Sequence, residues 1–488
     1  GNRLSESAAD MDFSLALNRE RQVLEFEQLT ATAGFGDIAV RQATIPLAGS
    51  ETPLNVRLAA DNVELGRLKP YLTFFALLPQ ELTLGGTAQS QVVVTQEDET
   101  YRISLESAQI QDFQVTSPEQ EPFRQERVTA RFDAYVNPTD KTIDIERLEL
   151  ESPQIKVRKG QFGRAIEGNT AKTHGEITAE WDWAAVSSLA SPFVPGTLDV
   201  AGQRQATVQF NSTYSTGDPN GLLANLNGTA SLGFDRAAYQ GLNFGPTDID
   251  IRIDDGRMQI EPFSTTVNEG QFRFAGQADL GQRPILLQTS ERLQMAEGIR
   301  ITQEMTDNLL KFVNPIFVGA VDVNGVLNFD AESMVLPLTG GFADRAEIRG
   351  TVAIPQIRME ATLLNRILAV IKESLRDQII EITPTKITLD NGAIRYEDME
   401  IIVGDNPVNF GGTIGLNESL DMTVVLPYTY EGKTARVGEP TAQKDKRIVL
   451  PLTGKLTAPK LNLQRLLEEQ LKGQFREQIR RGIEKLFD

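Results

Sequence analysis

The chain has 488 residues, no cysteine, one histidine and only 7% aromatic residues. Without cysteine it can form no disulfide, no cysteine-ligated zinc site and no thiol nucleophile. A Ser-His-Asp hydrolase would have to use His174, which lies in a polar stretch that we expect to be a surface loop. No G-x-S-x-G nucleophile segment occurs either. These gaps predict that the protein is not an enzyme and carries no cofactor or metal.

Long apolar runs are also missing. A membrane-spanning helix needs roughly 18 consecutive apolar residues, and the nearest stretches, 71–79 and 312–329, fall short of that. Positive charge is scarce as well, because the formal net charge is -19 and the isoelectric point is about 4.7. Such a surface repels phosphate over most of its area, so nucleic acid is not an expected partner.

What the sequence does contain is a repeated β-strand pattern. The apolar and glycine positions of residues 258–280 recur 136 residues later, and the pair Asp255-Gly256 meets Asn391-Gly392. A copy 234 residues earlier covers 24–40, and a second pattern at 79–94 recurs at 195–210 and, in part, at 321–325. Repeats that cannot bury an apolar face alone must stack on their neighbours, which predicts one continuous object.

Within the repeats, apolar and polar residues alternate. Residues 248–254 place isoleucine at every second position between aspartate and arginine, so one face of the strand meets apolar matter and the other meets water. Asp255-Gly256, Asn391-Gly392 and Asn227-Gly228 are turn signals, and the short connections predict an antiparallel meander. We expect longer insertions at 117–125, 160–173 and 431–446.

Helical periodicity is confined to a few stretches. Short helices are expected within 65–78, 183–194 and 306–318, and two longer amphipathic helices at 361–382 and 463–488. The first long helix is expected to pack on the sheet. The terminal one either caps the sheet or contacts a membrane or partner surface, through Leu467, Leu471, Phe475, Ile479, Arg476, Arg480 and Arg481.

These elements predict a mainly β fold. A meander of about 25 strands would be on the order of 120 Å long, and open sheets rarely exceed about ten strands without curling or splitting. We therefore expect an elongated, curled antiparallel sheet, a taco-like β-groove with an apolar concave face. It would comprise N-terminal repeats at 1–180, a central repeat at 181–300 and a C-terminal repeat at 301–488.

Several of these segments resemble the AsmA-like family. The resemblance is carried by residues 226–234 (LNGTASLGF), Gly241, 249–253, Asp255-Gly256 and 269–276 (EGQFRFAG), and by 450–459 (LPLTGKLTAP) before the terminal amphipathic helix. This family belongs to the bridge-like, repeating β-groove lipid-transfer proteins of bacterial envelopes. The resemblance covers most of the chain and is best at 220–280 and 386–487.

The resemblance implies a passive conduit that carries phospholipid acyl chains between inner and outer membranes through the periplasm. It also implies an anchoring segment absent from this chain, and a membrane surface or envelope protein at the ends. The family has no catalytic motif to carry over. From the alternation, the predicted lipid-binding residues are Val92, Val94, Val208, Phe210, Ile249, Ile251, Ile253, Met258, Ile260, Phe272, Phe274, Val321, Val323, Ile394, Tyr396, Val408, Phe410 and Ile414.

The same alternation permits a second interpretation. An ordinary sheet core also buries every second residue, and the chain would then be a structural or adhesive envelope scaffold with a dry interior. Bound lipid distinguishes the two hypotheses, because only an open apolar face has room for it.

Overall fold

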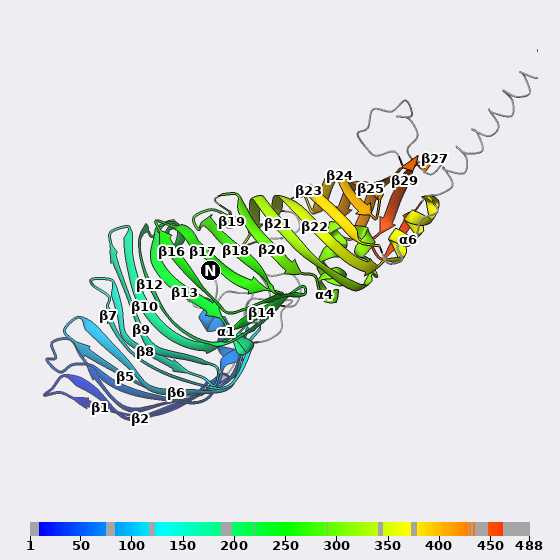
Figure 1. Cartoon of the computed structure of the whole chain (residues 1–488). Helices are drawn as coiled ribbons and strands as arrows, with labels where there is room; N and C mark the ends of the chain where they lie inside the picture. Colours follow the sequence, from blue (N-terminus) through cyan, green and yellow to red (C-terminus); the bar gives the residue numbers. More distant parts are fainter. Residues whose placement is uncertain are drawn as a thin grey trace, which may run out of the picture. The chain divides into compact units, whose positions relative to one another are not determined.

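The computed structural model describes residues 9–74, 83–116, 123–186, 198–218, 220–289, 291–339, 345–371, 378–427, 429–430, 433–434 and 448–461. In these ranges 28 strands belong to one hydrogen-bonded sheet, and β27 (Thr429–Tyr430) and β28 (Lys433–Thr434) form a separate hairpin. The strand pairings are antiparallel and the helices are short (Figure 1). The mainly β, antiparallel fold class is therefore confirmed.

The chain divides into two compact units. The first comprises residues 1–236, 248–261 and 279–282, and the second comprises 237–247, 262–278 and 283–488. The division falls inside the predicted central repeat of 181–300 rather than at either of its ends.

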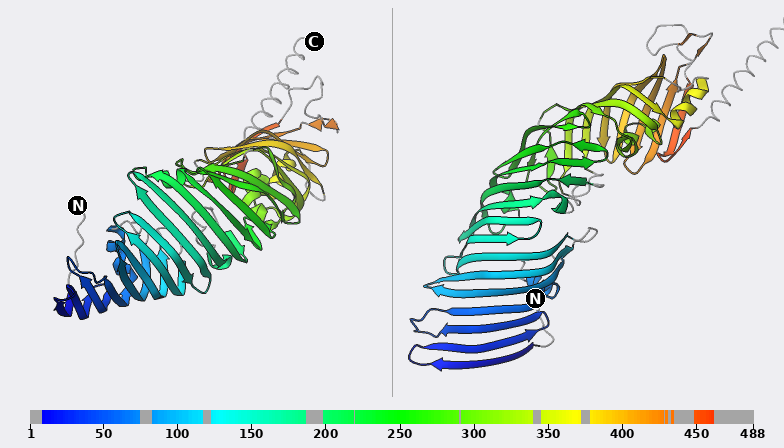
Figure 2. Two further views of the ribbon diagram at one scale, coloured as in Figure 1. Left: turned by 90° about the vertical axis from the view of Figure 1, so that its left-hand side faces the viewer. Right: turned by 60° about the horizontal axis from the view of Figure 1, so that its bottom comes forward.

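Strands β1 to β10 of the first unit form a meander in which each strand pairs with the next, and β10 then pairs with β12, β12 with β13 and β13 with β16 (Figure 2). Helices α1 and α2 follow β4 and β10. The elements are β1 (Ala9–Asn18), β2 (Val23–Ala33), β3 (Gly36–Pro46), β4 (Asn55–Glu64), α1 (Leu65–Phe74), β5 (Thr83–Glu97), β6 (Thr100–Thr116), β7 (Phe123–Asn137), β8 (Thr142–Glu151), β9 (Ile155–Glu167), β10 (Thr170–Asp182), α2 (Trp183–Val186), β11 (Leu198–Ala201), β12 (Gln203–Ser215), α3 (Gly221–Ala224), β13 (Leu226–Phe234) and β16 (Thr247–Asp254).

The second unit combines strands with two helical segments. Its first strands are β14 (Arg236–Tyr239) and β15 (Leu242–Phe244), and β17 (Arg257–Val267) continues into it from the first unit. The remaining elements are β18 (Gly270–Asp279), β19 (Leu286–Gln288), β20 (Leu293–Arg300), α4 (Gln303–Met305), η2 (Thr306–Leu310), α5 (Lys311–Val313), η3 (Pro315–Phe317), β21 (Val321–Pro337), β22 (Glu347–Glu360), α6 (Thr362–Leu368), η4 (Ala369–Ile371), β23 (Ile380–Asp390), β24 (Ala393–Val403), β25 (Asn406–Gly415), β26 (Ser419–Leu426), β29 (Ile448–Lys455) and β30 (Ala458–Leu461).

The repeat seen in the sequence is reproduced by the strand boundaries. A shift of 136 residues carries β17 onto β24 and β18 onto β25, and a shift of 234 in the other direction carries β17 onto β2. The turns match too. Asp255 and Gly256 have φ angles of 44° and 73°, and Asn391 and Gly392 have 49° and 69°, which is the left-handed pair that two-residue hairpins require. Both of these predicted turns are confirmed.

Two of the expected irregular segments are strands instead. Residues 160–173 belong to the hairpin β9–β10, which places His174 within β10 rather than in a loop. Asn227-Gly228 lies inside β13, not in a turn, and Phe210 of β12 pairs directly with Gly228. A Cβ on Gly228 would lie 2.6 Å from the carbonyl oxygen of Gln209, so close strand packing explains this glycine.

The helical predictions are met unevenly. The helix expected within 306–318 is found as η2, α5 and η3, interrupted at the extended residue Asn314; α1 spans 65–74, and α2 is a single turn over 183–186. The helix expected at 361–382 is wrong at its C-terminal end, because strand β23 begins at Ile380, and residues 372–377 lie outside the described residues. Ile380 pairs with both Ile357 and Val403, so the last isoleucines follow a strand alternation. The predicted segments 75–78, 187–194 and 463–488 lie outside the described residues.

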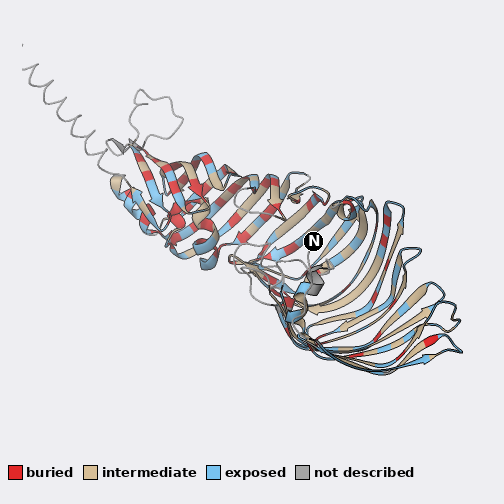
Figure 3. Cartoon of the chain, turned by 180° about the vertical axis from the view of Figure 1, so that it is seen from behind, coloured by how far each residue is buried: buried red, intermediate tan, exposed pale blue. Residues whose placement is uncertain are grey.

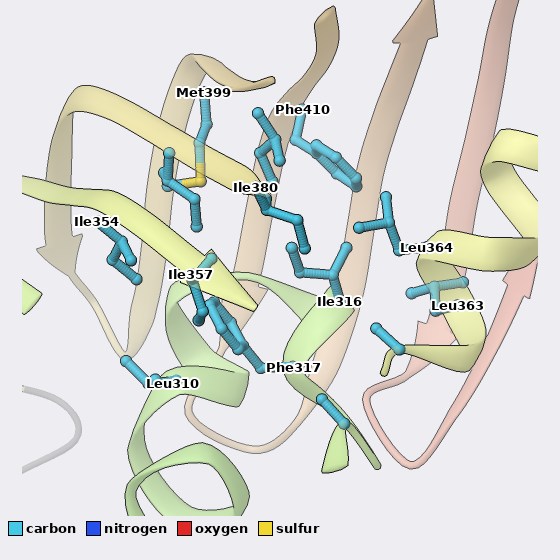
Figure 4. Close-up of a cluster of buried hydrophobic side chains, with 14 of the residues drawn as sticks. Leu310, Ile316, Phe317, Ile354, Ile357, Leu363, Leu364, Ile380, Met399 and Phe410 are labelled. Atoms are coloured by element: carbon cyan, nitrogen blue, oxygen red, sulfur yellow. The ribbon is translucent and has the colours of Figure 1, made fainter. Parts of the chain in front are cut away.

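A dry core forms in the second unit where the helical segments cover the sheet. Ile316 and Phe317 of η3 and Leu364 of α6 are fully buried against strand residues such as Ile380 and Phe410 (Figure 4). Burying each such side chain contributes about 1.5–3 kcal/mol relative to leaving it exposed. The helices supply the second layer that buries the apolar face of the sheet at this place.

Candidate functional site: an open apolar face

The first unit presents an apolar face that continues from strand to strand. Directly paired residues of an antiparallel sheet point to the same side, so the pairings define rows that cross β1–β10 and β12. We call these three rows the open apolar face. The first row is Phe13, Leu29, Val40, Leu58, Val92, Leu105, Phe132, Leu148, Gly160, Ile177 and Val208; the second is Leu15, Phe26, Ala43, Val56, Val94, Ile103, Ala134, Ile145, Phe162, Gly175 and Phe210; the third is Met11, Ala31, Ile38, Ala60, Ser90, Ala108, Ala130, Leu150, Val157, Ala179 and Ala206.

The rows are long and almost uninterrupted. Eleven strands give ten spacings of about 4.8 Å, so each row spans about 50 Å. Ser90 is the single residue with a polar side chain in the three rows. A contiguous apolar surface of this extent marks an interaction site in a folded protein, because exposed apolar area carries a free-energy cost.

The side chains of this face are partly exposed. Phe13 is 56% exposed and Met11 is 60% exposed, and most large side chains of the other strands are intermediate, whereas Phe410 in the core of the second unit is 0% exposed. Figure 3 shows the same contrast, with buried positions concentrated on β21–β26 and intermediate ones on β5–β12. The same alternating pattern therefore produces an open face in one unit and a closed core in the other.

β-Bulges hold the apolar residues in phase. On β8, Ile143 and Ile145 are followed by Leu148 and Leu150, so the alternation slips by one residue between Ile145 and Leu148. The β8–β9 register shifts at that point, and both leucines return to the apolar face. Similar shifts occur after Ser14, Val40, Gln91, Leu105 and Thr178. A bulge inserts one extra residue into a strand, which restores the side-chain parity.

The predicted lining residues of the first unit lie on apolar positions of its strands. Val92, Val94, Val208 and Phe210 belong to the three rows. The other predicted positions lie on β16–β17, where Ile251 pairs with Ile260 and Ile253 with Met258. These four residues and Ile249 are intermediate in exposure. Their role in binding lipid stays a prediction.

The predicted residues of the second unit have a different environment. Tyr396, Val408, Phe410 and Ile414 are at most 2% exposed and belong to the packed core. The partly buried positions Phe272, Val323 and Ile394 pack against this core, and Phe274 packs against a smaller cluster around Met295, Ala331 and Met334. Val321 is 48% exposed. The alternation alone did not distinguish these closed positions from the open ones.

The predicted membrane or partner contacts fall outside the described residues. Leu467, Leu471, Phe475, Ile479, Arg476, Arg480 and Arg481 all lie beyond residue 461. Among the helices that the structure does describe, none is long and apolar enough to cross a membrane.

The opposite face of the first unit carries a polar groove of about 1000 Å³ across β7–β10, β12, β13 and β16. Its lining follows the second row at Ile145, Phe162, Gly175 and Phe210 and includes the polar residues on either side of that row, among them Asp144, His174, Glu176 and Gln209. Glu176 accepts hydrogen bonds from Lys159 Nζ at 2.8 Å and from Gln209 Nε2 at 3.0 Å. The hydrogen bond from Lys159 is the main cause that lowers the pKa of the Glu176 carboxyl. This groove was not foreseen, since a polar face of alternating strands is ordinarily only solvated.

His174 packs in this groove against a glycine. A Cβ on Gly163 would lie 2.6 Å from Nε2 of His174 and 2.9 Å from Oδ1 of Asp144, so the imidazole and the carboxylate share the space above Gly163. The described part of the chain holds no cluster of three or more histidine, aspartate and glutamate residues arranged for a metal ion. We assign no reaction to the groove.

No protein-family model, curated protein or solved structure matches this chain. The resemblance to the AsmA-like family therefore stays a prediction that rests on the sequence segments that carry it.

Proposed function

We propose that the protein is a lipid-transfer protein whose open apolar face holds acyl chains. The observation that carries this proposal is the set of three apolar rows that cross eleven strands while their side chains stay partly exposed. Acyl chains laid on these rows bury methylene groups, each contributing about 0.8 kcal/mol. Bound lipid would offset the cost of exposing this surface to water.

The rows also suit movement along the sheet. Valine, leucine, isoleucine, phenylalanine and alanine follow one another at about 4.8 Å intervals, and the chemistry hardly changes from strand to strand. An acyl chain then meets similar contacts at successive positions, so it can shift without crossing a large barrier. Such a conduit is passive, and gradients or partners at its ends would set the direction.

The cellular setting follows from the sequence resemblance. From it we infer a role in the periplasm or cell envelope of a bacterium, with phospholipid carried between inner and outer membranes. A membrane surface or an envelope protein would receive the lipid at each end. These statements are part of the proposal.

The alternative function, a structural or adhesive scaffold with a dry core, is favoured by one observation in the second unit. There the apolar face of β22–β29 is filled by the residues of η3 and α6, which are fully buried. We therefore assign lipid binding to the first unit and a packed, supporting role to the core of the second unit.

Native mass spectrometry with lipid extraction of the purified chain tests this function. We expect several phospholipid molecules per chain, because the rows span about 50 Å. A mass that corresponds to protein alone, and that does not change after incubation with phospholipid vesicles, would favour the scaffold.

A further inference from the structure

One charged residue on the apolar side of the first unit has no ionic partner. Arg164 of β9 lies in a row beside the second row of the open apolar face, paired with Ile143 of β8 and Thr173 of β10. Its neighbours along the strand on the same side are Phe162 and Ile166. Among the described residues Arg164 forms no ion pair, and its Nε is buried without a hydrogen-bond acceptor.

The residue opposite Arg164 also has a buried polar atom without a hydrogen-bond partner. Thr173 is 5% exposed, and its Oγ1 has no hydrogen-bond partner within the part of the chain that the structure describes. The next residue in the row, Ser212, donates its hydroxyl to the carbonyl oxygen of Leu222 at 2.9 Å. A buried polar group without a partner destabilises the folded state, and a charged group does so more strongly. Two such groups on directly paired residues point to a ligand that satisfies both.

The second arginine on this side of the strands differs in its ion pairing. Arg204 of β12 lies in the same direction as Ala206 and Val208, and its Nε is likewise buried without an acceptor, but its Nη1 is 2.7 Å from Oδ1 of Asp235. Asp235 therefore neutralises the charge of Arg204, whereas no described carboxylate lies within 4 Å of the guanidinium of Arg164. This difference selects Arg164 as the anion-binding candidate.

We propose that Arg164 and Thr173 bind the anionic head of an amphiphile whose chain lies on the open apolar face. The guanidinium presents a planar fork of N–H donors that matches two oxygens of a phosphate or carboxylate, and the Thr173 hydroxyl donates to a further oxygen. The chain continues from this head onto Phe162 and Phe210, which are both paired with Gly175. This inference rests on the proposed function and narrows its ligand to anionic amphiphiles.

Isothermal titration calorimetry with three amphiphiles of equal chain length tests the proposal. Octyl phosphate, octyl glucoside and octyltrimethylammonium differ only in the head group, and inorganic phosphate supplies the head without a chain. We expect the full chain to bind octyl phosphate most tightly. Arg164→Gln should weaken octyl phosphate binding about tenfold, the size of a lost charge-assisted hydrogen bond, and leave octyl glucoside within about twofold.

Two further variants keep the result interpretable. Arg158→Gln removes the same charge from the same strand, but Arg158 is ion-paired with Glu180 at 3.0 Å, and all affinities should stay unchanged. Thr173→Val removes a hydroxyl without a partner, so it should leave the folded state as stable or more stable. It should nevertheless weaken octyl phosphate binding about fivefold, which a purely structural threonine would not do.

The outcomes separate this proposal from the function on which it rests. Equal octyl phosphate affinity in the wild type and Arg164→Gln, with octyl glucoside still bound, overturns the head site and leaves lipid binding intact. Inorganic phosphate that binds as tightly as octyl phosphate shows a simple anion site and overturns the amphiphile. If none of the three amphiphiles binds, lipid binding by the open apolar face is itself wrong.

Discussion

The side-chain amide of Asn314 donates a hydrogen bond to the hydroxyl of Tyr396 at 3.2 Å inside the core of the second unit. Asn314 is 0% exposed and Tyr396 is 2% exposed. The other end of the amide, Oδ1, accepts the backbone N–H of Ile316 at 3.0 Å and so caps η3. This contact fixes the helical segment on the sheet, and the same burial raises the pKa of the Tyr396 hydroxyl.

We expect Tyr396→Phe to lower the free energy of unfolding of the second unit by about 1–3 kcal/mol. The variant removes the acceptor of the buried amide and leaves Asn314 Nδ2 beside the weak acceptor Met399 Sδ at 3.4 Å. Urea denaturation followed by circular dichroism measures the change. Tyr101→Phe on the half-buried strand β6 is the control and should change stability by less than about 0.5 kcal/mol.

The open apolar face predicts a difference between two adjacent valines. Val94 lies in the second row, paired with Val56 and Ile103, whereas Val93 points to the other side of the sheet, paired with Arg57 and Ser104. Val94→Asp puts a carboxylate in the path of the acyl chains, which costs several kcal/mol when it is desolvated. We expect severalfold less phospholipid to co-purify with this variant.

Val93→Asp is the matched control for Val94→Asp, because it adds the same charge to the same strand. Lipid extraction and quantification should find as much phospholipid bound to Val93→Asp as to the wild type. Both variants should give wild-type far-ultraviolet circular dichroism spectra. Equal lipid content in the two aspartate variants would show that the rows do not hold lipid.

The bulge in β8 predicts that residue number matters there more than residue type. Deleting Glu146 removes the extra residue between Ile145 and Leu148, so Ile145, Leu148 and Leu150 alternate regularly and stay on the apolar face without a bulge. Deleting Glu149 instead leaves Leu148 next to Leu150, so Leu150 turns to the polar side or the register slips. Misplacing one leucine costs about 1.5–3 kcal/mol. Hydrogen exchange of residues 142–151 should therefore speed up in the Glu149 deletion and stay near wild type in the Glu146 deletion; equal exchange in the two deletions would contradict the role of the bulge.

The ion pair in the polar groove predicts a depressed carboxyl pKa that can be measured directly. Lys159 hydrogen-bonds to Glu176 and lowers the pKa of its carboxyl below the ordinary value of 4.5. A group whose pKa is lowered by folding stabilises the folded state above its unfolded pKa, and this contribution is lost as pH falls through the folded pKa. Carboxyl carbon NMR should give a Glu176 midpoint below 4.5, and Lys159→Gln should raise it. An unchanged midpoint in Lys159→Gln would show that the ion pair does not form in solution.

Sequence alone predicted the strands well because alternation and turn chemistry are local. Asp255-Gly256 and Asn391-Gly392 form equivalent hairpin turns, and the repeat fixed equivalent strand boundaries 136 residues apart. The prediction from sequence failed where a helical and a strand pattern fit the same residues. Ile379 and Ile380 suit a helix face and a strand equally, and the pairing of Ile380 with Ile357 and Val403 decides for the strand.

The local sequence pattern could not predict which parts of the apolar sheet surface are covered by helical segments. Phe210 and Phe410 have similar sequence surroundings of alternating apolar residues, yet Phe210 is partly exposed and Phe410 is fully buried. The difference in exposure comes from Ile316, Phe317 and Leu364. These residues are distant in sequence from β25 but belong to the same packed core of the second unit. Arg164 was also missed, because an arginine in a strand reads as solvent-facing until its pairing with Thr173 places it on the apolar side.

The bulges of the first unit have a consequence for how such a face evolves in length. Each hairpin brings its own correction of side-chain parity, so inserting or deleting a hairpin leaves the rows on either side in step. Every hairpin then adds about 10 Å of apolar surface with no change in its chemistry. The number of hairpins therefore sets the length of the open apolar face.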